Sequence, residues 1–256
     1  MELEHIRIKP VWPKSKEETW DELFEHLDER IVTKRLFSRV PFWAYAAAVV
    51  VVLFLTGAFY TKTERTERGQ HAVVQLPDRS TVTLNAESRL SYKPCIWLIA
   101  RKVRLEGEAF FEVKQGSRFS VQSGHNQVNV LGTAFNVYTR IGTYRVTCLS
   151  GQVEVHAGGE FAVLNPHMQA VFNEQQLSLT DDVSPAAATG WIQGMFVFEE
   201  TPLKEVIAEV ERQYNIQVAS DYDPNHFYTG NFSKTDKAEE LLEIIGKPFG
   251  ITFSIK

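Results

Sequence analysis

A run of 19 uncharged residues, Phe42–Tyr60, constrains the fold of this chain more than any other feature. As an α-helix it would be about 28 Å long, close to the hydrocarbon thickness of a bilayer. The alternative, a buried core helix, is seldom apolar on every face over this length. Trp43 and Tyr45 at one end and Tyr60 at the other fit the aromatic belts of membrane interfaces. The run therefore predicts a single transmembrane helix.

A cleaved signal peptide is the second alternative for this run. Its apolar region would be shorter and nearer the N-terminus, whereas about 40 residues precede Phe42 here, so an uncleaved anchor is favoured. Lys and Arg residues near the two ends are tied at four against four, over residues 21–40 and 61–80. The cluster Lys34, Arg35 and Arg39 lies close to the run without intervening acids and favours a cytoplasmic N-terminus.

Residues 15–31 have the pattern of an amphipathic helix. Ser15 and Glu18 have the spacing of a capping box, in which each side chain accepts a hydrogen bond from the other residue's backbone N–H. One face is apolar, with the spacing of a helical stripe: Trp20, Leu23, Phe24, Leu27 and Ile31. The other faces are acidic, and no Lys or Arg occurs between residues 17 and 29.

This helix needs a partner for its apolar face. A segment of about 40 residues is too short to bury the stripe in a domain of its own, and a lone helix of this length is marginal in water. An acidic amphipathic helix suits an apolar groove with a basic rim, as a DNA-binding protein presents. We expect Trp20, Leu23, Phe24 and Leu27 to be the partner-binding anchors. A solvated helix resting on the membrane surface is the alternative.

Residues 71–180 change to a period of two, with turn signals between the short segments. Strands that recur at this spacing predict an all-β sandwich, barrel or solenoid, and the pattern does not choose among them. We expect Phe110, Phe111 and Phe135 in the core, and Gly107 where a strand reverses.

Four blocks of this region resemble the FecR domain, in the same order. They are Leu76–Ala86, Arg101–Val113, Val130–Val137 and Leu149–Val155. The chain departs from the family at turns, with Arg79 where a Gly is usual and Pro166-His167 where a Pro-Gly pair is usual.

The C-terminal segment, residues 195–256, has the pattern of a small α+β module in the order βαββαβ. It resembles the domain that commonly follows FecR domains in Bacteroidota, which is related to the short signalling domain of secretins and TonB-dependent receptors. The resemblance rests on Phe198, Pro202 and Leu203, then on residues 211–216 and 228–232.

The sequence offers no catalytic, metal-binding or cofactor-binding motif, so we expect no enzyme and no cofactor. The net charge of -5 argues against direct nucleic-acid binding. Cys95 and Cys148 fit two partly buried thiols, and a disulfide between them is the alternative.

The FecR resemblance implies a transmembrane anti-sigma factor of the inner membrane. Its tail would hold an extracytoplasmic-function sigma factor, and its periplasmic part would contact the signalling domain of a TonB-dependent receptor. Receptor occupancy, with regulated proteolysis near or inside the helix, would release or activate the sigma factor. A membrane-anchored periplasmic binding module and an envelope-assembly module, both without a sigma partner, are the alternatives.

The predicted architecture is a single transmembrane helix with an all-β domain and a small α+β domain. The expected segments are a cytoplasmic sigma-interacting tail (1–40), the transmembrane helix (41–60), a linker (61–70), a periplasmic β-rich FecR domain (71–180), a second linker (181–194) and a periplasmic α+β signalling domain (195–256).

Overall fold

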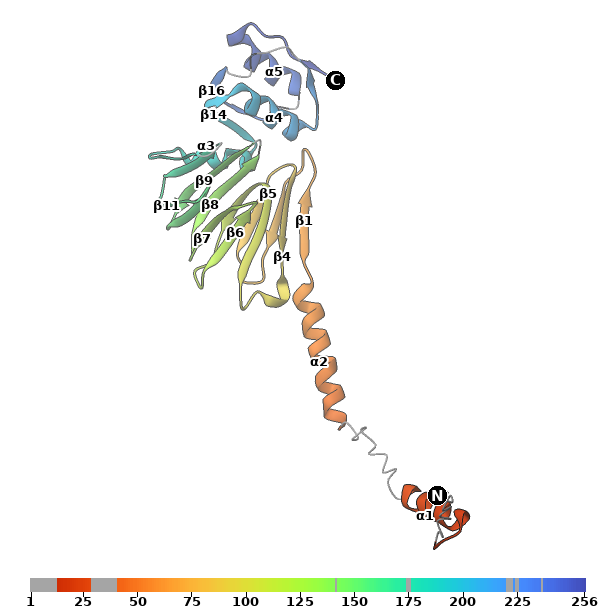
Figure 1. Ribbon diagram of the computed structural model, residues 1–256. Helices are drawn as coiled ribbons and strands as arrows, with labels where there is room; N and C mark the ends of the chain where they lie inside the picture. The colour runs from red at the N-terminus through yellow and green to blue at the C-terminus, as the bar shows by residue number, and fades with distance from the viewer. Residues whose placement is uncertain are drawn as a thin grey trace, which may run out of the picture. The chain divides into compact units, whose positions relative to one another are not determined.

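Two compact units make up the chain, residues 1–53 and residues 54–256. The computed structural model (Figure 1) describes residues 13–28, 41–140, 142–173, 176–219, 223, 226–235 and 237–256.

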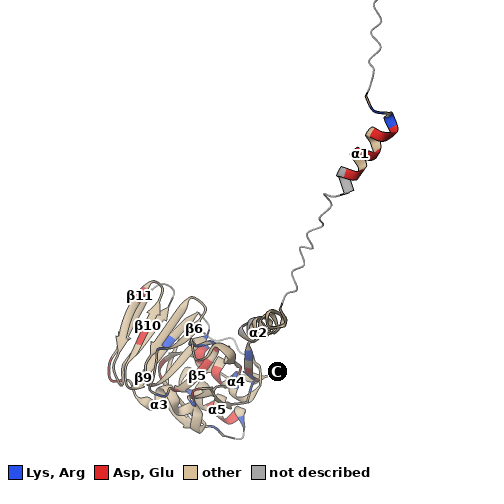
Figure 2. Cartoon of the chain, turned by 90° about the horizontal axis from the view of Figure 1, so that it is seen from below, with Lys and Arg blue, Asp and Glu red and all other residues tan. Residues whose placement is uncertain are grey.

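Helix α1 spans Lys16–Asp28 and begins at the predicted capping box. The backbone N–H of Ser15 donates to Glu18 Oε2 at 2.9 Å, and the N–H of Glu18 donates to Ser15 Oγ at 3.2 Å. Acidic side chains lie along the helix (Figure 2), two of them in the first turn, where negative charge is favourable. The predicted end of the helix at Ile31 falls outside the described residues.

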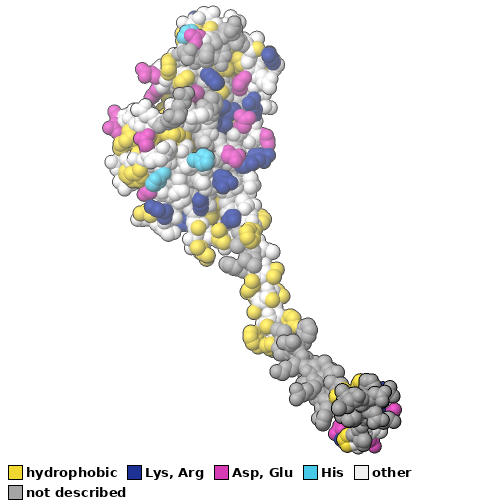
Figure 3. Space-filling view, viewed as in Figure 1, with side chains coloured by type: hydrophobic (Ala, Val, Ile, Leu, Met, Phe, Trp, Pro, Cys, Tyr) yellow, Lys and Arg dark blue, Asp and Glu magenta, His cyan; other side chains and the backbone are white. Residues whose placement is uncertain are grey.

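Helix α2 spans Phe42–Phe59, within the apolar run. Apart from Thr56, its described side chains are apolar, and most of them are exposed (Figure 3). In the part of the chain that the structure describes, no helix has both the length and the apolar character needed to cross a membrane. The transmembrane helix stays a prediction.

Strands β1–β13 form one continuous sheet with two branches that share the long strand β5, Arg101–Glu112. The first branch has the order β1-β4-β5-β6-β7-β10-β11, and the second has the order β2-β3-β5-β8-β9-β12-β13. The other bounds are β1 Lys62–Thr66, β2 Ala72–Gln75, β3 Thr81–Leu84, β4 Ser88–Tyr92, η1 Pro94–Ile96, β6 Phe119–Ser123, β7 Asn126–Val130, β8 Ala134–Arg140, β9 Thr143–Ser150, β10 Val153–Ala157, β11 Glu160–Leu164, β12 Gln169–Asn173 and β13 Gln176–Thr180.

The two branches face each other as two layers around one core. A single hydrophobic cluster contains buried side chains of both, so a sandwich is realised among the three architectures that the sequence left open. Phe111 and Phe135 are fully buried and stack with ring centroids 5.0 Å apart, as predicted for the core. Phe110 is only half-buried, because neighbouring residues of a strand point to opposite faces.

Gly107 lies inside β5 and not at a strand reversal, so that prediction was wrong. Residues before it pair with β4, and residues from Gly107 onward pair with β8. A Cβ atom at this position would lie 2.5 Å from Ser88 Oγ and 2.8 Å from Ser88 Cα, and φ is 97°. Glycine is required here because β5 passes from one layer to the other against the backbone of Ser88.

The turn between β2 and β3 keeps its geometry without the usual glycine. Leu76 O accepts from the N–H of Arg79 at 2.9 Å, and Arg79 has φ 67°. His167, in the second departure from the family pattern, has φ 69°. The backbones of Arg79 and His167 therefore adopt the left-handed conformation, which glycine adopts more easily.

Replacing Arg79 with glycine should stabilise the β-rich domain by about 0.5–1 kcal/mol. A residue with a Cβ atom costs free energy in the left-handed region. This cost exceeds the free energy lost through the extra entropy that glycine gives the unfolded chain. Arg79 is exposed, so little packing is lost. Urea unfolding of the full chain in detergent checks this. The matched control Arg89→Gly, inside strand β4, should destabilise, and equal effects at both positions would contradict the backbone argument.

The C-terminal module has the predicted βαββαβ order. A short helix α3 (Pro185–Thr189) and turn η2 (Gly190–Gln193) lead into β14 (Met195–Pro202), and α4 (Leu203–Tyr214), β15 (Val218–Ala219), β16 (Phe227–Ser233), α5 (Ala238–Gly246), η3 (Lys247–Phe249) and β17 (Ser254–Ile255) follow. β14 pairs with β16, and β15 pairs with β17, both antiparallel. The helices α4 and α5 bury apolar residues in a separate second core.

Candidate functional site

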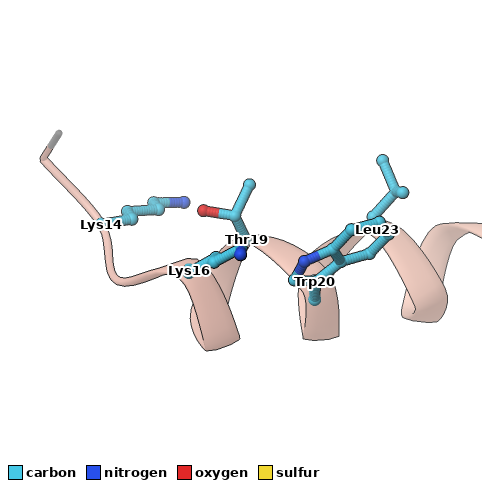
Figure 4. A pocket seen from close by; sticks show the side chains of 5 residues that line it. All are labelled: Lys14, Lys16, Thr19, Trp20 and Leu23. Carbon is cyan, nitrogen blue, oxygen red and sulfur yellow. The ribbon is translucent and has the colours of Figure 1, made fainter.

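The apolar face of α1 is open. Trp20, Leu23 and Phe24 are 51%, 52% and 61% exposed, and the Trp20 and Phe24 rings stack with centroids 5.8 Å apart. Figure 4 shows Trp20 and Leu23 beside a hollow of about 500 Å³, whose described lining also includes Lys14, Lys16 and Thr19. The described lining residues belong to α1 and to the segment just before it.

The structure thus brings three of the four predicted anchors to one helix face. The side chain of Leu27 lies outside the described residues, although its backbone belongs to α1. The predicted partner is not tested by this geometry, and the binding role of the anchors stays a prediction.

A second candidate site lies where α4 docks on the β-rich domain. The apolar residues on one face of α4 fill the core of the C-terminal module. Polar residues occupy another face at helical spacing: Glu205, Glu209, Arg212 and Gln213. We define the α4 junction as this polar face with its partners in the β-rich domain: Glu205, Glu209, Arg212 and Gln213 on α4, and Asn85, Glu108, Asn136, Arg140 and Arg145 on the other side.

Asn85 bridges two carboxylates at the centre of the junction. Its Nδ2 donates to Glu108 Oε2 at 2.8 Å and lies 3.3 Å from Glu209 Oε1. Its Oδ1 accepts from Gln213 Nε2 at 2.6 Å, and Asn136 Nδ2 donates to Glu108 Oε1 at 2.9 Å. The side chains of both modules therefore form one hydrogen-bonded network that excludes bulk water.

The charges of this network are buried and partly compensated. Arg212 is 5% exposed and donates to Glu209 Oε2 from Nη2 at 2.8 Å and from Nε at 3.1 Å. Arg140 donates to the backbone oxygens of Ala86 and Glu87, at 2.5 and 3.1 Å. Together the two guanidinium groups face two carboxylates, with one cation and one carboxylate on each side of the junction.

The two carboxylates differ in pKa. Burial, and the charge of nearby Glu209, raise the pKa of Glu108, and Arg140 only partly opposes this. Burial also acts on Glu209, but Arg212 and Arg140 outweigh it and hold the pKa of Glu209 below its usual value. Arg212 is therefore the main cation that lowers the pKa of Glu209 inside the junction, and Arg140 adds to its effect.

The rim of the junction adds a second ion pair and a backbone bond. Arg145 Nη2 lies 3.2 Å from Glu205 Oε2, and the N–H of Gly69 donates to the carbonyl of Arg212 at 2.7 Å. A cavity of about 80 Å³ beside Glu108 and Glu209 has room for a few water molecules, but not for a drug-sized ligand. The site joins two modules through these contacts.

The described residues also bear on metal and thiol chemistry. Among those described, no group of three or more His, Cys, Asp or Glu side chains is placed to hold a metal ion. Cys95 and Cys148 are free thiols, the first exposed and the second buried, so the alternative of a disulfide is not realised. Burial raises the pKa of Cys148 to about 11.

Sequence reasoning missed the α4 junction. The polar face of α4 resembles a solvated helix face, and Asn85, Glu108 and Asn136 are single polar residues in or beside strands. One signal was available: α4 carries polar residues at helical spacing opposite its apolar stripe, and Asn85 and Asn136, in or beside strands, indicate buried hydrogen bonding.

Comparison with known proteins adds two family matches and two structures. The FecR protein family matches residues 62–154, and the FecR, C-terminal family matches residues 195–256. Two crystal structures of candidate anti-sigma factors from Parabacteroides distasonis ATCC 8503 are similar, with TM-scores of 0.71 and 0.70 and 27% sequence identity in each case. They cover 77% and 76% of this chain and 98% and 99% of their own chains. No curated protein gives a significant match.

Proposed function

The chain belongs to the FecR family of anti-sigma factors, and from this premise we propose that it controls an extracytoplasmic-function sigma factor in response to a TonB-dependent receptor. The observation that carries the sigma-binding part is the exposed, stacked pair of Trp20 and Phe24 on an acidic helix. Aromatic side chains of this kind supply most of the binding energy in many interfaces.

The acidic faces of α1 support a basic partner. A sigma factor must present basic surface to DNA, so an acidic helix with an apolar stripe competes for that surface. In this proposal the aromatic pair provides affinity, and the carboxylates accelerate association and select the partner.

We place the chain in the inner membrane, with its N-terminus in the cytoplasm and both folded modules in the periplasm. The length and apolar composition of residues 42–60 support the anchor, and the basic cluster at Lys34–Arg39 supports the orientation. The C-terminal module, which resembles receptor signalling domains, would receive the receptor's contact. The α4 junction would carry a change in that module to the β-rich domain.

A Trp20→Ala, Phe24→Ala double variant should weaken sigma binding by about 2 kcal/mol or more for each anchor, which is roughly 30-fold per residue. The measurement is the affinity of the full chain in detergent for a small sigma factor from the same host. Alanine favours helix, so lost binding would not reflect an unfolded α1.

The matched control is Glu25→Ala, beside Phe24 on the same helix. It should change the association rate and its salt dependence much more than the affinity. Unaltered binding by the double variant would remove the anchor assignment. No binding by the wild-type chain to any such factor would favour a membrane-anchored binding module instead.

A further inference from the structure

The segment between β4 and β5 exposes two large apolar side chains at one end of the β-rich domain. Leu98 is 101% exposed and Ile99 is 81% exposed. Trp97, next to them, is only 4% exposed and packs edge-on against Tyr92 and Phe119, with ring centroids 5.6 and 5.9 Å away. Trp97 thus anchors the turn, while its two successors point outward.

The turn has a fixed backbone. The N–H groups of Ile99 and Ala100 both donate to the carbonyl of Ile96 at 2.9 Å, and the N–H of Trp97 donates to Pro94 at 3.2 Å. The outward direction of Leu98 and Ile99 is therefore a feature of the fold and not of a loose loop.

The same turn lies against the last turn of α2. A Cβ atom on Gly57 would lie 3.4 Å from Cys95 Sγ, and Lys93 Nζ lies 5.8 Å from the centre of the Phe59 ring. Figure 3 shows apolar side chains at this end of the β-rich domain, where the helix meets it. Gly57 is three residues inside the end of the apolar run at Tyr60, or about 4.5 Å along a helix.

Cationic side chains border the apolar turn. A hollow of about 240 Å³ beside it is lined in part by Lys93, Lys102 and Arg104, and Thr61, just after α2, lines the same hollow. Lys102 and Arg104 are exposed on alternate positions of β5. Exposed apolar side chains next to a group of cations match the layers of a membrane surface, with acyl chains next to phosphate headgroups.

We propose that the turn formed by residues 94–100 inserts Leu98 and Ile99 into the periplasmic face of the membrane, while Lys93, Lys102 and Arg104 bind the phosphates of anionic phospholipids. This inference rests on the proposed inner-membrane location. A lipid surface is the occupant because the turn lies against the helix end, and the hollow beside it has only cations among its described charged lining residues.

The contact gives the β-rich domain a second attachment to the bilayer. A domain joined by one helix alone is free to rotate about its tether, whereas two attachment points restrict its tilt. The C-terminal module, at the opposite end of the same unit in Figure 1, is then held away from the membrane and toward the periplasm.

The test uses the full chain in nanodiscs of phosphatidylcholine with phosphatidylglycerol. Cys95 is replaced by Ser, and a polarity-sensitive fluorophore is attached to a new cysteine at Leu98, at Val50 in α2 or at Ile244 on α5. The buried Cys148 should not react. Lipids with a spin label near the headgroup quench fluorophores in the upper acyl region.

We expect a blue shift and quenching at Leu98→Cys, and neither change at Ile244→Cys. A fluorophore at Val50→Cys that is excluded from water would show that α2 lies in the membrane. A solvent-exposed, unquenched fluorophore at Leu98 with a buried one at Val50 would overturn the lipid contact and leave the anchor intact. A solvent-exposed fluorophore at Val50 would overturn the location and the contact together.

A second set of variants tests whether the three cations bind the lipid phosphates. The triple change Lys93→Gln, Lys102→Gln and Arg104→Gln should abolish the dependence of the Leu98 signal on phosphatidylglycerol. The matched variant Arg118→Gln, an exposed cation on another loop, should keep it. The same dependence in both variants would rule out these three cations as the phosphate ligands.

Discussion

Replacing Arg212 with alanine should destabilise the docked C-terminal module by roughly 3–5 kcal/mol, because a buried carboxylate would lose its closest cation. Glu209 is 14% exposed at its side chain and accepts both donors of Arg212. Its second oxygen bonds only neutral amides, Asn85 and Gln213, among the contacts described here. The free energy of unfolding of the full chain, measured with urea, checks this.

Two variants separate charge from packing. Arg212→Ala combined with Glu209→Gln should recover much of the lost stability, since the uncompensated charge is then absent. Lys204→Ala, at an exposed position of the same helix, should change little. A loss that is equally large with Gln at position 209 would mean that Arg212 acts through packing alone.

The pH dependence of this variant has a defined sign. Arg212 holds the pKa of Glu209 low, so its removal should raise that pKa above the unfolded value. A carboxyl with a raised folded pKa contributes stability at low pH and loses it as pH rises through that pKa. The destabilisation by Arg212→Ala should therefore be smaller at about pH 5 than at pH 7, and a larger effect in acid would contradict the assignment.

Replacing Arg101 with alanine should have a comparable effect, roughly 3–5 kcal/mol, on the β-rich domain. Arg101 is 8% exposed at its side chain and pairs with Asp78, which is 15% exposed. It also donates to the carbonyls of Ser117 at 2.6 Å and Lys114 at 2.9 Å. One guanidinium therefore joins the β2–β3 turn to the loop before β6, and its loss leaves a carboxylate and two carbonyls without this donor.

Arg101→Lys should recover only part of the loss, because an ammonium group cannot reproduce the planar fork. The matched control is Arg89→Ala, whose exposed pair with Glu106 at 3.7 Å should contribute at most about 1 kcal/mol. Equal urea midpoints for the Arg101 and Arg89 variants would show that burial of the pair does not matter.

The ion pair of Arg101 with Asp78 contributes stability only while Asp78 is ionised. Burial opposes ionisation of Asp78, but the bonds from Arg101 and Ser80 outweigh it and lower the pKa. The stability from this lowered pKa is present above the unfolded value of about 3.8 and is lost as pH falls through the folded value. The stability difference between wild type and Arg101→Ala should therefore narrow in strong acid.

Local patterns predicted the local structure well. The capping box at Ser15 and Glu18 predicted the start of α1, and the burial habit of aromatic residues correctly placed Phe111 and Phe135, but not Phe110, in the core. The βαββαβ order followed from apolar spacing and turn residues. Each of these features depends on residues close together in the sequence.

Contacts distant in sequence were beyond such patterns. Asn85 and Gln213 are 128 positions apart, and a carboxylate such as Glu209 is normally solvated on a helix. Only the docking of α4 on the β-rich domain turns that face into buried surface. Gly107 shows the same limit, since its need for glycine comes from the approach of Ser88 and not from a local reversal.

Strand β1 determines how the domain responds to mechanical load. It starts three residues after Phe59, the end of α2, and pairs with β4 from Lys62 opposite Tyr92 to Thr66 opposite Ser88. Force along a strand is shared by all its hydrogen bonds, whereas force across it breaks them one after another. A pull from the helix along β1 would thus meet the whole ladder in shear, and a sideways pull would peel it open at Lys62, where the ammonium group lies 6.0 Å from the Tyr92 ring centre.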